Sequence, residues 1–208
     1  MEQARKNKHV FVKILLIIFV VILGIFSAIH HVNIINAFAN YSHNVTAWEK
    51  HNHSGIIYDQ GEFEDLKYGF GNISANACGA ISVYNILTLE NKNPYFPDII
   101  REFDFGGENL FGIAGTKPTR IITLLKKHGF TVNTTFNKRK FKEYAQKNKY
   151  AIYLYVGSER GQIFGHYQLM YNFDGEKFDT INTTGQYTYE EIVDIPNLFL
   201  SMMIGVNI

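Results

Sequence analysis

Cys78 is the only cysteine of the 208-residue chain and therefore its only possible thiol nucleophile. It lies in the segment Asn76-Ala77-Cys78-Gly79-Ala80, at the start of an apolar run that is typical of a buried helix. The thiolate is the reactive form of cysteine, and the N-terminus of a helix lowers a thiol pKa because it favours negative charge. Gly79 lacks a side chain beside the sulfur, which leaves room for a substrate carbonyl. A free cysteine is also a common core residue, so this segment alone leaves open whether Cys78 is a nucleophile or buried filler.

His166 is the histidine best placed to serve as the base. Among the eight histidines, it alone directly precedes a clear strand pattern and has a glycine beside it. A rigid sheet would orient a base at the start of a strand. A thiolate needs a nearby imidazolium for stabilisation and for protonation of the leaving amine. We therefore expect Cys78 and His166 to form a nucleophile and base pair, although a histidine at a strand edge is by itself more typical of a structural or surface residue.

A third residue is expected to orient the imidazole, and Asn182, Asp179 and Asp174 follow on the adjacent hairpin arm. Alternation along a strand puts Asn182 and Asp179 on opposite faces. Asp174 belongs to the Asp174-Gly175 turn and is explained by turn chemistry. Asn182 ends the strand and is the preferred candidate; the alternative is that it only begins the next turn.

The pattern around these residues predicts an α+β fold, with helices first and an antiparallel sheet afterwards. Thr116 is expected to cap a helix that has Pro118 in its first turn and Gly129 beyond its end. The glycine-rich segment Gly106 to Gly115 is expected to form a loop beside the cleft. The expected helices begin near Cys78, at Phe96, at Thr116 and at Lys138; the expected strands are Phe130–Phe136, Ala151–Val156, Tyr167–Phe173, Phe178–Asn182 and Leu200–Val206.

The N-terminus predicts a membrane anchor. Basic residues precede Ile14 to Ile29, which is uncharged throughout and would rise about 24 Å as a helix. Because the positive charges come before the apolar run, the rest of the chain is expected outside the cell. A cleaved signal peptide is the alternative, since Ala37-Phe38-Ala39 resembles a cleavage site. The expected organisation is a cytosolic tip and anchor over 1–30, a polar stalk over 31–67 and one domain over 68–208.

Composition narrows the function classes. The formal charge of +1 gives no basic face for nucleic acid. One cysteine excludes an intramolecular disulfide. His43, His51 and His53 lie in a loop-like segment without a completing carboxylate or thiol, so a solvated stalk is preferred over a metal site. We expect no metal and no organic cofactor.

Three motifs together resemble a known family. ANACGAISVYNIL, GTKPTRIITLLKKHGF and GHYQLMYNFDGEKFDTIN resemble, in this order, the bacterial double-glycine leader peptidases and their stand-alone relatives within the papain-like cysteine peptidases. The resemblance covers Tyr68 to Asp194. It implies a papain-like fold, a central helix carrying Cys78 on an antiparallel sheet, and a Cys78, His166 and Asn182 triad.

Two positions depart from that family. Its oxyanion-binding glutamine, six residues before the cysteine, is replaced by Asn72, which keeps an amide donor but is one methylene shorter. The usual Asp-Pro at the orienting position is Asn182-Thr183 here, and asparagine can still orient a histidine. The resemblance implies that Asn72 and the Cys78 N–H form the oxyanion hole.

The sequence therefore predicts a membrane-anchored thiol hydrolase that cleaves a peptide or amide bond of a peptide or protein substrate through an acyl-enzyme. A cell-wall amidase or transpeptidase would use the same nucleophile and base. The substitution at Asn72 also keeps open an inactive papain-like domain that binds a peptide or serves as an accessory or immunity protein. The sequence reveals neither the substrate specificity nor the oligomeric state.

Overall fold

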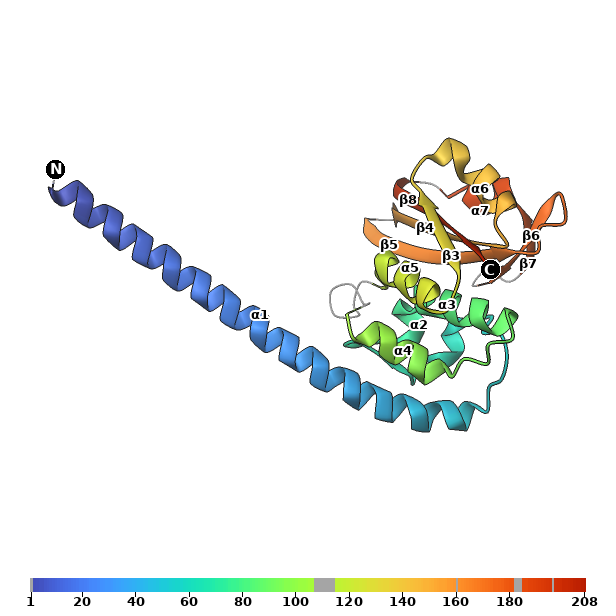
Figure 1. Ribbon diagram of the computed structural model, residues 1–208, viewed down its shortest axis with the longest axis horizontal. Helices are drawn as coiled ribbons and strands as arrows, with labels where there is room; N and C mark the ends of the chain where they lie inside the picture. Colours follow the sequence, from blue (N-terminus) through green and yellow to red (C-terminus); the bar gives the residue numbers. More distant parts are fainter. Residues whose placement is uncertain (1, 107–114, 160, 182–184, 196) are drawn as a thin grey trace.

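The computed structural model describes residues 2–106, 115–159, 161–181, 185–195 and 197–208. Its centre is a six-stranded antiparallel sheet with the order β3-β8-β4-β5-β6-β7. Helices α2 to α5 gather on one side of this sheet, α6 and α7 lie on the other, and α1 extends away from the domain (Figure 1). The expected mixture of helices and an antiparallel sheet is thus confirmed.

The helices are α1 (Glu2–His51), η1 (Gln60–Phe63), α2 (Ile73–Asn76), α3 (Cys78–Leu89), α4 (Phe96–Asp104), α5 (Pro118–Lys127), η3 (Lys138–Lys140), α6 (Phe141–Lys147) and α7 (Tyr189–Val193). The strands are β1 (Lys67–Tyr68), β2 (Gly71–Asn72), β3 (Thr131–Thr135), β4 (Tyr150–Glu159), β5 (Gln162–Tyr171), β6 (Lys177–Ile181), β7 (Gly185–Thr188) and β8 (Leu198–Asn207).

The sheet has a separate core on each face, because successive side chains of a strand point to opposite sides. Ile152 and Leu154 of β4 pack into the core that contains α3. Ala151 and Tyr153 of the same strand pack into the core that contains α6 and α7. The face on which a strand residue lies therefore decides which helices it can contact.

Helix α3 follows the expectation closely. Its residues from Cys78 to Leu87 are all buried, as an apolar run without a polar face requires. The helix ends just before Asn91, which adopts the left-handed conformation with φ 54°. Asparagine tolerates this conformation better than most residues, so Asn91 acts as the stop signal.

Helix α5 also forms where expected, but its cap is different. The N-cap is Lys117 rather than Thr116, and no side chain caps the helix. The Thr116 hydroxyl lies near the Asn76 carbonyl (3.5 Å) and the Tyr68 hydroxyl (3.1 Å) instead. The Thr116 hydroxyl, which the local sequence pattern predicts to be a helix cap, therefore makes tertiary contacts instead.

The hairpin between β5 and β6 turns where Asp174-Gly175 predicts it. The Asp174 carboxylate accepts hydrogen bonds from the backbone N–H groups of Glu176 and Lys177, both at 2.8 Å. Gly175 has φ 108°, which a residue with a side chain rarely adopts. Strand β5 begins earlier than expected, at Gln162, because residues from Gln162 onward pair with the distal half of β4.

Helix α1 is continuous across the boundary expected between anchor and stalk. Within the described residues, no helix is long and apolar enough to cross a membrane, so the transmembrane helix expected over 14–29 is not supported. The second half of α1 joins the domain. Trp48 is buried against Phe63, Tyr84 and Phe96, with ring centroids 4.9–6.1 Å away.

Three asparagines spaced one helical turn apart on α1 form hydrogen bonds with the backbone of residues 67–69. The Nδ2 groups of Asn36 and Asn40 both donate to the carbonyl oxygen of Gly69, at 2.7 and 2.8 Å. Asn44 exchanges two hydrogen bonds with the backbone of Lys67, at 2.7 and 2.9 Å. The polar residues of this part of the chain therefore bind backbone groups of the domain.

Candidate active site

Cys78 occupies the first turn of α3, where the helix leaves backbone N–H groups without intrahelical partners. Its side chain is 5% exposed, and this burial raises the pKa of the thiol above its usual range. Backbone N–H groups of Tyr167, Gly79 and Cys78 itself act in the opposite direction, because they donate toward the sulfur. Burial has the larger effect, so the thiol is the resting form.

The thiol lines a cleft of about 610 Å³ between the start of α3, the start of α5 and strands β4, β5 and β8. Ligand pockets of roughly 300–1,000 Å³ are typical of small-molecule and short-peptide sites. The described lining holds no carboxylate and no imidazole, and much of it is apolar. It comprises Ala75, Asn76, Cys78, Gly115, Thr116, Pro118, Leu154, Val156, Ile163, Phe164, Gly165, Tyr167 and Leu200.

Thr116 braces this cleft. Its carbonyl oxygen accepts the Tyr167 hydroxyl at 2.8 Å, and its hydroxyl lies 3.1 Å from that of Tyr68. A Cβ on Gly79 would lie 2.8 Å from the Thr116 Cβ and 2.8 Å from the Ile121 Cδ1. Gly79 is therefore required by helix packing, a reason that the sequence interpretation in terms of substrate access did not include.

His166 lies on the other face of the sheet from Cys78. It pairs with Tyr155 across β4 and β5, and the two rings are 5.7 Å apart between centroids. Tyr155 packs with the core beneath α6 and α7, whereas Cys78 belongs to the α3 core. No hydrogen bond joins Cys78 and His166 in the described part of the chain. The neighbouring Tyr167 occupies the face toward Cys78.

The surroundings of His166 favour its neutral form. Burial lowers the pKa of its imidazole to about 4, since desolvation opposes the charged state. An ion pair with a thiolate would have the opposite effect and raise this pKa. His166 is also the fifth residue of β5 rather than its first, so it does not stand at the open end of the strand.

The three candidates for the orienting residue have different positions. Asn182, the preferred one, lies outside the described residues. Asp179 is half-buried and accepts hydrogen bonds from Asn172 and Gln186, both at 3.0 Å. Asp174 is occupied by the turn, as expected. No contact between His166 and either aspartate is present in the described structure.

Asn72 serves as the N-cap of α2. Its side-chain oxygen accepts hydrogen bonds from the Ala75 backbone N–H (3.0 Å) and the Ser74 hydroxyl (3.1 Å). It is not among the described residues that line the cleft, whereas Asn76 is. The structure therefore brings Cys78 together with Asn76, Thr116 and Tyr167. Sequence reasoning did not select Thr116 and Tyr167 because long-range contacts place them at the cleft, and it considered Asn76 only as part of the start of the helix.

The histidines of the 43–53 segment have structural partners. His43 and His51 contact the backbone oxygen and the carboxylate of Asp65, each at 2.7 Å. His53 packs against Trp48 and Phe63. Across the described ranges, no group of three or more histidine, cysteine or acidic side chains is arranged to hold a metal ion.

Comparison with known proteins gives structural similarity only. No family model matches the chain, and no curated protein matches it. The chain is similar to the peptidase domain of Streptococcus ComA, a bi-functional ABC transporter involved in a quorum sensing pathway. The TM-score is 0.45 at 15% identity, over 62% of this chain and 90% of that one.

A second similar structure is the ComA peptidase domain of Streptococcus mutans in complex with a small-molecule inhibitor. The TM-score is 0.34 at 14% identity, over 47% of this chain and 80% of that one. Both similar structures are peptidase domains. At these values the similarity assigns neither an activity nor a substrate to this chain.

Proposed function

We propose that this chain is a thiol hydrolase that cleaves a peptide or amide bond with Cys78 as nucleophile. In this mechanism the Cys78 sulfur attacks the carbonyl carbon, and the thiol proton passes to His166 and then to the leaving amine. Water hydrolyses the resulting thioester with His166 as base, which restores the thiol. Asn182 orients the imidazole, while the Cys78 N–H and the amide of Asn72 stabilise the oxyanion.

The observation that carries the proposal is the position of the only thiol. Cys78 lies at the N-terminus of α3, where no side chain caps the backbone N–H groups. It also lines a cleft large enough for a short segment of substrate. The N–H groups of Cys78 and Gly79 already point toward the sulfur. The negative charge of the thiolate, which forms before the attack, would find these donors in place, without reorganisation of the backbone.

The mechanism requires a change in β5. His166 must reach the α3 face, where Tyr167 is now held by its hydrogen bond to Thr116. A shift of one residue in the β4–β5 pairing would exchange the two faces, because side chains alternate with a period of two. Substrate binding in the cleft, which Gly165 and Tyr167 line, would supply a reason for such a shift.

A second candidate function is peptide binding without catalysis. The specific observation in its favour is the separation of Cys78 and His166 by the sheet, together with an imidazole pKa of about 4. A domain that only binds a peptide needs the cleft but not the ion pair. An amidase or an acyl transferase would instead share the proposed mechanism and differ only in its substrate or acceptor.

The rate of Cys78 alkylation as a function of pH separates these functions. Wild type, His166→Ala and the control His128→Ala would be measured with and without a library of short peptides. A hydrolase gives a thiol that reacts well below the free pKa of about 8.5, at least once peptide is bound, and only His166→Ala abolishes this. A thiol that stays unreactive near neutral pH with every peptide, in all three proteins, would falsify the catalytic proposal and leave peptide binding.

A further inference from the structure

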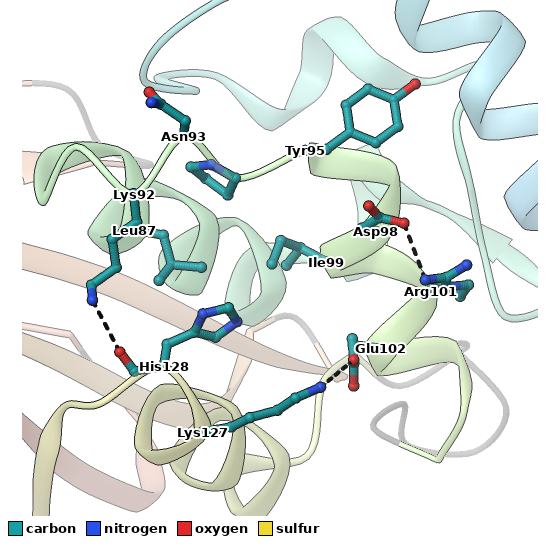
Figure 2. A pocket seen from close by; sticks show the side chains of 11 residues that line it. Leu87, Lys92, Asn93, Tyr95, Asp98, Ile99, Arg101, Glu102, Lys127 and His128 are labelled. Carbon is teal, nitrogen blue, oxygen red and sulfur yellow. Dashed lines mark hydrogen bonds and ion pairs between the residues drawn. The ribbon is translucent and has the colours of Figure 1, made fainter.

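A second cavity, of about 350 Å³, lies between the end of α3, helix α4 and the end of α5. Figure 2 shows it between the turn that follows α3, helix α4 and the end of α5. Leu87 and Ile99 are directed into the same space as the imidazole of His128. None of its lining residues belongs to the Cys78 cleft, so this cavity is separate from the proposed catalytic function.

The side chains that line this cavity include more basic than acidic groups. The carboxylate of Asp98 already pairs with Arg101 at 3.2 Å. The carboxylate of Glu102 pairs with Lys127 at 2.6 Å and with Arg120 at 2.9 Å. Both acidic groups of the lining are therefore neutralised by bases from α4 and α5.

Lys92 supplies an additional positive charge at the other end. Among the described residues its ammonium forms no ion pair; it donates to the backbone oxygen of His128 at 3.1 Å and lies 5.1 Å from the centre of the Phe130 ring. Its side chain is exposed, so it can turn toward a bound group. The carboxylate of Glu90 interacts with Lys92 but is already paired with Lys149 at 2.6 Å, so Lys92 adds net positive charge at the rim of the cavity.

His128 lies between the two lysines. Neither of its ring nitrogens has a hydrogen-bond partner among the described residues. Burial lowers the pKa of the imidazole, and Lys127 and Lys92 lower it further. Glu102 has a smaller, opposite effect, so the neutral form of the ring is favoured. It can offer one N–H to an acceptor.

We propose that this cavity binds a small organic anion, with a carboxylate or phosphate headgroup held by Lys92 and His128 and a short apolar body against Leu87 and Ile99. A free inorganic ion would leave the apolar wall uncovered, and a neutral compound would leave the net positive charge at the rim without an anion. Pockets of this size generally combine an apolar wall with a few convergent polar groups in the same way.

Calorimetric titration of the full chain tests this proposal with four probes: hexanoate, phenyl phosphate, inorganic phosphate and the neutral hexanamide. We expect one of the two organic anions to bind more tightly than both inorganic phosphate and hexanamide, and the tighter one identifies the headgroup. Lys92→Met keeps the apolar stem and removes the charge, and should weaken this binding at least about tenfold. Lys126→Met makes the same change on the exposed side of α5, outside the cavity, and should leave it unaltered.

Hexanamide binding as tight as that of the tighter organic anion, or binding that is equally weakened in both lysine variants, would refute a built anion site. So would the absence of binding by both organic anions at millimolar concentration. Cys78→Ser should bind as wild type does, so the outcome is independent of the catalytic proposal. In nuclear magnetic resonance spectra, the ring signals of His128 should shift with the bound anion, and His128→Gln identifies them.

Discussion

Substitution of Gly79 by alanine tests whether the residue after Cys78 is required for packing or for substrate access. The added Cβ would meet the Thr116 Cβ and the Ile121 Cδ1, each at 2.8 Å. Contacts under 3.0 Å force a neighbour to move. The end of the Ile121 side chain can rotate, but Thr116 is held by the hydroxyls of Tyr68 and Tyr167.

The expected loss follows from two opposing effects. Overpacking of a filled site costs about 1–3 kcal/mol. Alanine regains up to about 1 kcal/mol over glycine within a helix. The net destabilisation of Gly79→Ala is therefore about 1–2 kcal/mol, or roughly a tenfold change in the ratio of folded to unfolded protein at 1.4 kcal/mol.

Urea unfolding followed by tryptophan fluorescence is a suitable assay. Trp48 is the only tryptophan and is buried in the domain, so its fluorescence reports the unfolding of the domain. Gly24→Ala is the matched control: it is also a helical glycine, but nothing lies within 4 Å of its Cβ position. We expect the control to unfold at or above the wild-type midpoint, because alanine favours a helix and meets no neighbour there. If Gly79→Ala is as stable as the control and loses only thiol reactivity, the packing explanation is wrong and the access explanation is right.

Three further predictions concern stability. The pKa of His166 is about 4 in the folded protein and near 6.5 in the unfolded chain, so between these pH values only the unfolded chain binds the proton. The free energy of unfolding of the wild type should therefore fall by roughly 3 kcal/mol as the pH falls from 6.5 to 4. His166→Phe should lack this loss in pH-dependent unfolding, whereas an ion pair with a thiolate would reverse its sign. Trp48→Ala should cost about 3–5 kcal/mol in thermal unfolding followed by circular dichroism, because the ring fills a buried aromatic cluster; an unchanged midpoint would mean that α1 does not contribute to the core. Asn85→Ala should cost about 2–4 kcal/mol, because the amide makes two buried hydrogen bonds of 2.8 and 2.9 Å to one backbone residue. The exposed Asn133→Ala should be neutral in the same experiment, and equal effects of the two would contradict this assignment.

The sequence by itself determined the elements whose signals are local. The apolar run after Cys78 made a buried helix, and Asp174-Gly175 made the hairpin turn, because side-chain period and turn chemistry act within a few residues. Helix α7 begins with a complete capping box formed by Thr188 and Glu191, which is also a local interaction. In each case the signal lies within a few residues of the element that it specifies.

Only the tertiary structure decided where the site residues lie. The register of β4 and β5 assigned Tyr167 to the Cys78 face and His166 to the other, and a pattern apolar on both faces does not encode this choice. Thr116 contacts Tyr68 and Tyr167, which are distant in sequence, and does not cap α5 as expected. Asn72 caps α2 and does not line the cleft. The residue types show which side chains could react. Whether those side chains lie close together depends on packing between elements far apart in sequence, and a local sequence pattern does not contain this information.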